Sequence, residues 1–184
     1  MEDVGCHTVS VASPVINASG YASPSLLLFL NSEISPAIVD HVVASISAAV
    51  DISIRRTSGI NRLGLYFDRQ QIRDFRSYVN RIFRNGRVTM MEVVAIMTYT
   101  ERIKNSWAGV FRDLLLEEMF VSALVLATKY LNDECHHNSV WVPIVEHFSS
   151  PEMEQMLRHF LYALDWKLRI IPADLLHLYN KFYL

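Results

Sequence analysis

The chain has few cysteines and a strongly uneven distribution of basic residues. Cys6 and Cys135 are its only cysteines and are far apart, and no lysine or arginine precedes Arg55. No disulfide framework is implied, and we expect an intracellular protein, nuclear or cytoplasmic. The apolar run "LLLFL" lacks a basic flank, and the run 114–131 is interrupted by two glutamates and a lysine. Neither pattern predicts a signal peptide or a membrane span, so no membrane partner is expected.

The motifs of common enzyme classes are also missing. There is no Gly-rich phosphate loop, no Gly-x-Ser-x-Gly and no His-Glu-x-x-His. Glu117 and Glu118 are adjacent, so they would point about 100° apart on a helix and could not act as an acid–base pair. "DECHH", Asp133 to His137, contains metal-ligand types, but consecutive residues rarely converge on one ion. We therefore expect a loop there, with no bound metal and no cofactor. We also expect no catalysis, although a helical enzyme whose site has no recognised motif stays open as a further possibility.

The net charge of −2 argues against a protein that covers nucleic acid by neutralising phosphates. Positive charge is nevertheless concentrated locally, because the region from Arg55 to Arg87 contains many arginines and only two aspartates, Asp68 and Asp74. Because the net charge of the whole chain is slightly negative, nucleic acid is not an expected partner.

Helical periodicity dominates the chain after about Ile34. Residues 1–34 have no periodic apolar pattern and are expected to be irregular or partly disordered. Capping signals then open successive amphipathic segments, beginning with Ser35 and Pro36. The expected helices cover about 35–50, 68–85, 89–103, 114–131, part of 140–148, 150–164 and 172–183.

No stretch alternates with a period of two between hairpin turns, so the predicted fold is all-α. The helix 114–131 has no clean polar side and should be the central one. We expect three parts: an irregular lead over 1–34, a helix and Arg-rich connection over 35–66, and the main helical domain over 67–184.

Lys129 is a charge inside this apolar helix and needs water, a carboxylate or a partner. It lies near the helix C-terminus, where the macrodipole favours a cation by roughly 0.3–1 kcal/mol and its stem can lie along apolar surface. A structural lysine and a lysine that binds carbonyl or carboxylate groups of a partner both remain open.

The sequence resembles the cyclin box over roughly Phe67 to Leu184, and in particular the P-type cyclins of the phosphate-response class. "SALVLATKYLND", "NSVW" and "FLYALDWKL" occur in the order and spacing of that class, and "YTERI" is similar to the end of its second box helix. The matching residues are Ala127, Lys129, Tyr130, Asp133, Asn138, Trp141, Phe160, Leu161, Leu164, Asp165, Trp166 and Leu168.

The resemblance implies a five-helix cyclin box with one additional helix before it and one after it. It also implies a regulatory subunit that binds and activates a cyclin-dependent kinase. In the family, the lysine matched by Lys129 hydrogen-bonds to the kinase near its mobile helix, and residues at the end of the fifth helix pack on that helix. The kinase-binding residues expected here are Lys129, Tyr130, Leu157, Leu161, Trp166 and Leu168.

One position departs from the family pattern. The family usually has a glutamate three residues before the Phe-Leu pair, and this sequence has Leu157 there. Either the kinase contact is more apolar, or Glu154 takes the role, or activation has been lost. A Met-Arg-x-x-Leu substrate-docking patch is also absent.

Four arginines, Arg69, Arg73, Arg76 and Arg84, fall on one side of the first box helix. They form either a solvated face or a site for a phosphate or acidic peptide, because guanidinium groups chelate phosphate oxygens in pairs. The second interpretation supports an alternative function, a pseudo-cyclin adaptor that binds an acidic or phosphorylated protein without activating a kinase.

Overall fold

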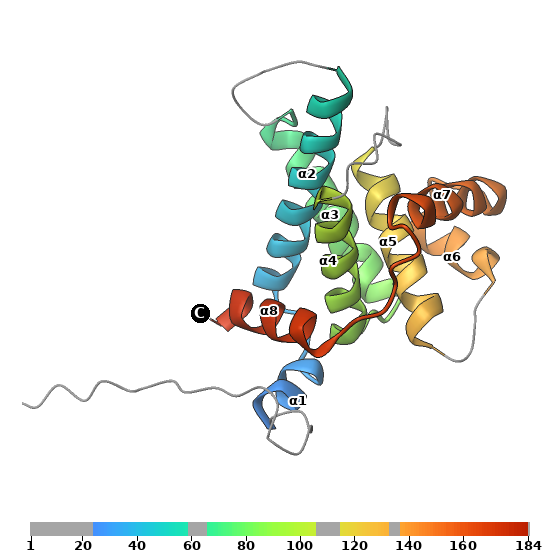
Figure 1. Ribbon diagram of the computed structural model, residues 1–184. Coiled ribbons are helices and arrows are strands. Elements are labelled where there is room, and N and C mark those ends of the chain that lie inside the picture. Colours follow the sequence, from blue (N-terminus) through green and yellow to red (C-terminus); the bar gives the residue numbers. More distant parts are fainter. Residues whose placement is uncertain (1–23, 59–65, 106–114, 133–136, 184) are drawn as a thin grey trace, which may run out of the picture.

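The computed structural model describes residues 24–58, 66–105, 115–132 and 137–183. Within these ranges the chain forms α-helices and no strand. They are α1 (Pro24–Leu30), α2 (Pro36–Ser58), α3 (Arg69–Asn85), α4 (Met90–Asn105), α5 (Leu116–Leu131), α6 (Asn138–Val145), α7 (Ser150–Ala163) and α8 (Pro172–Tyr183). The all-α prediction is confirmed (Figure 1).

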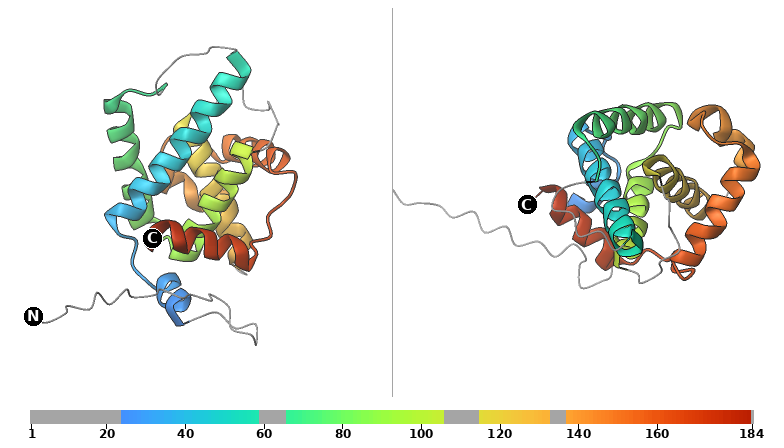
Figure 2. Two further views of the ribbon diagram at one scale, coloured as in Figure 1. Left: turned by 60° about the vertical axis from the view of Figure 1, so that its left-hand side comes forward. Right: turned by 90° about the horizontal axis from the view of Figure 1, so that it is seen from above.

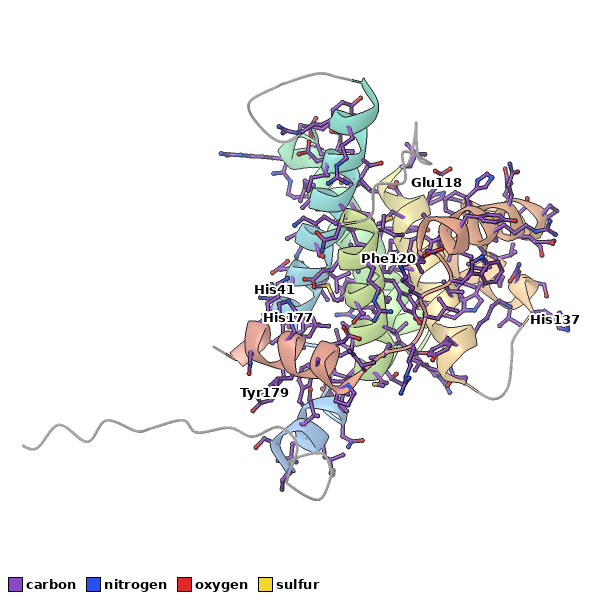
Figure 3. The ribbon with its side chains drawn as sticks, viewed as in Figure 1. His41, Glu118, Phe120, His137, His177 and Tyr179 are labelled. Atoms are coloured by element: carbon purple, nitrogen blue, oxygen red, sulfur yellow. The ribbon has the colours of Figure 1, made fainter. Side chains whose placement is uncertain are left out.

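Helix α5 lies at the centre of the fold, in contact with α2, α3, α4, α6 and α7. Every residue from Met119 to Thr128 is buried, because a helix with no polar side is stable only when other helices surround it. Seen from above in Figure 2, α6 and α7 cover the side of α5 that faces away from α2. Phe120, labelled in Figure 3, lies edge-on to Phe75 with ring centroids 6.1 Å apart. The predicted central position of this helix is confirmed.

Capping residues begin α3 and α4 as predicted. The Asp68 carboxylate accepts hydrogen bonds from the backbone amides of Gln70 at 2.7 Å and Gln71 at 2.8 Å, and the Asp68 amide donates to the Gln71 side chain. The Thr89 amide donates to Glu92 at 2.7 Å in the same arrangement. These bonds satisfy amides that have no partner inside a helix, and they therefore set where both helices start.

Helix α1 lies inside the segment 1–34 that was expected to be irregular, so this prediction is wrong for residues 24–30. Leu26 and Phe29 are buried, and the Phe29 ring lies edge-on to Tyr179 of α8 with centroids 5.6 Å apart. Two apolar residues are too few to produce a recognisable period, and contacts with α4 and α8 stabilise a helix too short to form alone. Residues 1–23 lie outside the described residues.

Helix α2 continues to Ser58, beyond the predicted end near Val50. Arg55 pairs with Asp51 one turn earlier at 2.9 Å, and the Arg56 guanidinium donates to the Lys104 carbonyl of α4 at 3.1 Å. Both contacts extend the helix past its apolar stripe.

Part of α2 also meets the length and composition of a membrane span. The window lies within residues 36–56, and 50% of it is buried inside the helical fold. The buried core helix of a protein without membrane spans meets the same criteria, so this observation alone is weak evidence for a span.

Candidate partner-docking surface

The end of α7 carries the most exposed aromatic side chains near the residues expected to bind a partner. Trp166 is 62% exposed and Tyr162 is 66% exposed. Their rings contact edge to face with centroids 6.2 Å apart. Exposed aromatic pairs of this kind are typical of protein-binding surfaces, where an aromatic side chain supplies much apolar area with few rotatable bonds.

Helix α7 is anchored by its start and by its apolar face. Ser149 and Glu152 form a capping box, in which the Ser149 amide donates to the Glu152 carboxylate at 2.7 Å. Hydrogen bonds from the Ser149 side chain and amide lower the pKa of the Glu152 carboxyl. Met153, Leu157 and Phe160 are buried, and α7 packs against α5 and α6. The opposite side of α7 therefore remains at the surface.

The turn after α7 directs Trp166 away from the core. Asp165 and Trp166 have φ of 52° and 57°, a left-handed conformation that non-glycine residues rarely adopt. The Trp166 amide donates to the Leu161 carbonyl at 3.1 Å, and the Lys167 amide donates to the Leu164 carbonyl at 3.1 Å. These bonds close the helix end and leave the indole exposed.

Leu161 and Leu168 flank the aromatic pair in the chain. Leu161 and Leu168 are partly buried against the core. The Tyr99 hydroxyl donates to the Leu168 carbonyl at 3.1 Å, and burial, together with the nearby Tyr130, raises the pKa of Tyr99. We use the name docking surface for the set Leu161, Tyr162, Trp166 and Leu168.

Lys129 lies in the last turn of α5 and is half-buried, immediately before the exposed Tyr130. This position places a cation at the negative end of the helix dipole, as the sequence indicated. The parts of Lys129 and Tyr130 in a partner contact stay predictions.

The structure does not bring Leu157 to the docking surface. Leu157 is only 8% exposed, because it falls on the face of α7 that packs on the core. The predicted contact of Leu157 with a partner stays a prediction, and this burial does not favour it. Glu154, the suggested substitute, is exposed and pairs with Arg158 on the same helix.

The four predicted arginines of α3 do not form one site. Arg76 pairs with Asp40 of α2, which lowers the pKa of the Asp40 carboxyl, and Arg73 donates to Gln70. Arg69 and Arg84 are exposed, but fifteen residues of helix separate them by about 22 Å along the axis. One phosphate group cannot contact all four arginines.

Metal-ligating side chains are dispersed in the part of the chain that the structure describes. No three His, Cys, Asp or Glu side chains there lie close enough to hold an ion. Most of the "DECHH" segment, residues 133–136, lies outside the described ranges, and His137 is exposed at the start of α6 (Figure 3).

Sequence reasoning missed Tyr162. It follows Leu161 directly and lies off the apolar stripe of α7, so helical periodicity assigns it only to the solvent side. Helical spacing gives no signal for it, because Trp166 lies beyond the end of α7 and meets the Tyr162 ring through the left-handed turn.

The described residues form a helical domain with an exposed aromatic pair at the end of α7. Residues 69–169, more than half of the 184 residues, match the family described as cyclin, N-terminal domain. The chain therefore belongs to the cyclin family, whose members are regulatory and non-catalytic. The match runs from the start of α3 to the turn after α7 and includes Lys129 and Trp166. No solved structure matches the chain significantly.

Proposed function

We propose that this cyclin binds and activates a cyclin-dependent protein kinase through the docking surface and Lys129. The observation that carries the proposal is the exposed Trp166, held in a left-handed turn beside Tyr162. An exposed, rigidly placed indole in a regulatory domain is suited to become the buried centre of an interface. The motif residues quoted above also support membership of the P-type class, and the two isolated cysteines support an intracellular place of action.

The proposed mechanism is a population shift in the kinase. Apolar side chains of the docking surface would pack on the mobile helix of the kinase N-lobe and favour its active position. In that position the glutamate of the kinase helix can pair with the lysine that anchors ATP. The cyclin supplies differential binding to the active state and takes no part in phosphoryl transfer.

Lys129 would add a polar contact at the edge of this apolar interface. Its ammonium group has three donors and no acceptor, so carbonyl oxygens at the end of a kinase helix or loop are suitable partners. Leu157 is buried where relatives usually have glutamate, so the interface proposed here is more apolar than in those relatives.

The test is a pull-down from native extract with kinase activity measured in the eluate. The purified chain should retain an active cyclin-dependent kinase, and Lys129→Glu should lose it. Lys104→Glu is a matched control, because Lys104 also lies in the last turn of a helix, at the end of α4. Figure 1 shows that the C-terminal ends of α4 and α5 lie at opposite ends of the fold. Retention of equal kinase activity by Lys129→Glu and the unmodified chain would contradict the role of Lys129.

The alternative function is the adaptor that binds an acidic or phosphorylated protein without activating a kinase. The buried Leu157 and the exposed Arg69 and Arg73 favour it. Because Arg76 already pairs with Asp40, the charge-reversal variant that tests this function is Arg69→Glu with Arg73→Glu. An eluate without kinase, together with a bound acidic protein lost in this double variant, would replace the kinase proposal with the adaptor.

A further inference from the structure

The segment between α7 and α8 is held by two side chains of α4. The Arg102 guanidinium donates to the carbonyls of Lys167 at 2.6 Å and Arg169 at 2.9 Å. Tyr99, almost one turn earlier, donates to the carbonyl of Leu168 at 3.1 Å. Three consecutive carbonyls of a segment without helix or sheet therefore accept hydrogen bonds from one neighbouring helix.

Arg102 also ties the start of α8 to this segment. Its guanidinium donates to the Asp174 carboxylate at 2.8 Å, and the same carboxylate accepts the amide of Ile171 at 2.9 Å. The Arg102 side chain is only 25% exposed, which makes its ion pair less screened than one at the open surface. One guanidinium thus joins α4, the turn after α7 and the first turn of α8.

The three carbonyls that accept these hydrogen bonds, those of residues 167–169, follow directly after Trp166. The left-handed φ of Trp166 is unfavourable by itself and persists only where surrounding contacts hold it. The Trp166 carbonyl accepts the Leu168 amide at 3.0 Å, and the next three carbonyls accept hydrogen bonds from Arg102 and Tyr99. The Lys167 carbonyl belongs to the peptide group one residue beyond Trp166, so its hydrogen bond with Arg102 fixes the path of the chain that leaves Trp166.

We infer that Arg102 is a positioning residue for the kinase-docking surface, and that it acts by fixing the direction of Trp166. The expected effect on kinase binding rests on the proposed function, whereas the effect of Arg102 on the direction of Trp166 does not. Arg102 itself need not touch the kinase. Its planar group, with five donors in a fixed arrangement, reaches two carbonyls and a carboxylate together, which a lysine ammonium on a flexible stem cannot reproduce.

The first readout follows Trp166 directly, by ¹⁹F NMR of the full chain labelled with 5-fluorotryptophan. The chain has three tryptophans, and substitution of each by phenylalanine assigns the three resonances. Arg102→Gln should shift or broaden the Trp166 resonance and leave the Trp141 resonance in place. Arg102→Lys, which keeps the charge beside Asp174, should produce the same change to a smaller extent.

The second readout is affinity for the cyclin-dependent kinase recovered by the unmodified chain. Arg102→Gln should weaken binding by at least about tenfold, the loss of one well-placed contact. Arg102→Lys should fall between Arg102→Gln and the unmodified chain.

Arg81→Gln is the matched control. Arg81 has a side chain 33% exposed and also donates to a carbonyl, that of Ile144, and pairs with Glu146. It joins α3 to the end of α6 and does not contact the segment after Trp166. Arg81→Gln should reduce thermal stability by an amount similar to Arg102→Gln, with the Trp166 resonance and kinase affinity unchanged.

The outcomes separate the inference from the proposed function. If Arg102→Gln lowers stability but leaves both the Trp166 resonance and kinase affinity unchanged, Arg102 is only a structural residue and the inference is wrong. If Trp166→Ala binds the kinase normally, or no kinase is recovered, the proposed function fails while the NMR result still decides whether Arg102 positions Trp166. If Arg102→Gln does not fold, Arg102→Lys carries the same two readouts.

Discussion

Trp141 and Trp166 belong to the same cyclin box and lie in opposite environments. Trp141 of α6 is 3% exposed, and its ring lies so close to Gly86 that a Cβ built on that glycine would be 3.0 Å from it. Trp166 is mostly exposed after the last turn of α7. The residue type is identical, but one indole stabilises the domain and the other leaves apolar area available to a partner.

The difference arises from the backbone that carries each ring. Trp141 lies within a regular helix packed on α3, α5 and α7, so its direction follows from helix geometry. Trp166 follows the end of a helix in the left-handed region, and hydrogen bonds to the next three carbonyls hold its segment. An interior side chain is placed by packing, whereas this exposed one is placed by polar contacts.

The largest expected effect is on stability. Trp141→Ala should lower the free energy of unfolding by about 3–5 kcal/mol, because it opens a large cavity between packed helices. Trp166→Ala should change it by less than about 0.5 kcal/mol, as for a surface residue. Urea denaturation followed by circular dichroism measures both values. A large destabilisation by Trp166→Ala would remove the contrast between the two rings.

Trp141→Phe refines this test. The Trp141 indole nitrogen is buried and has no hydrogen-bond partner among the described residues. Phenylalanine removes this unsatisfied donor while it keeps most of the ring, so the gain partly offsets the lost volume. We expect a much smaller destabilisation than for alanine.

The next effect is on binding. Trp166→Ala should reduce affinity for the recovered kinase by about 2 kcal/mol or more, roughly 30-fold, as for an aromatic residue at the centre of an interface. Tyr162→Ala should have a smaller effect in the same direction, since it removes the edge contact of the indole. Isothermal titration calorimetry with the purified kinase measures both.

Leu28→Ala is the control for lost apolar surface. Leu28 is the most exposed leucine of α1 and lies outside the region that matches the cyclin family. It should leave kinase affinity unchanged. A loss equal to that of Trp166→Ala would mean that general surface hydrophobicity, and not the docking surface, determines binding.

The fold was largely predictable because its signals are local. Asp68 and Thr89 identified two helix starts, and "FVSALVL", whose residues are all apolar or small, identified the central helix. Helix α1 was not predictable, since Leu26 and Phe29 acquire their role from α4 and from α8, the latter more than 140 residues later. Contacts between distant segments leave no periodic trace in the sequence.

The candidate site was less predictable than the fold. The resemblance to cyclins indicated Lys129 and Trp166, and the family match confirms the cyclin box that contains them. The resemblance could not show that Leu157 faces the core, because two residues of one helix can match a motif and still lie on different faces of that helix. Arg102 and Tyr99 were absent from the predicted site, since their contacts are with backbone carbonyls far along the chain.

Gly86→Ala tests how tightly the buried Trp141 ring is packed, in contrast to the exposed Trp166 ring. A Cβ there would lie 3.0 Å from the Ile82 carbonyl and 3.0 Å from the Trp141 ring, which is tighter than ordinary contact. We expect about 1–3 kcal/mol of destabilisation from overpacking, with no change in kinase affinity. In the Trp141→Phe background the effect should be smaller, because the shorter ring relieves one contact. Equal effects in both backgrounds would show that the Ile82 carbonyl alone sets the strain.

The smallest effect expected is a change in acid stability that neither tryptophan causes. The Arg76 guanidinium lowers the pKa of Asp40 in the folded chain below its ordinary value of about 3.9, so the unfolded chain binds more protons in this range. The resulting stabilisation is present above the ordinary pKa and is lost as the pH falls through the lowered one. Arg76→Gln should return Asp40 toward its ordinary pKa and flatten the dependence of stability on pH in that window. The change should be slight, because both side chains are exposed to solvent.

Acid unfolding, followed by the ¹⁹F resonance of Trp141, measures this change in stability. An unchanged slope in Arg76→Gln would show that the ion pair does not form in solution, whereas a change in the Trp166 resonance before unfolding would mean that the docking surface is coupled to α2.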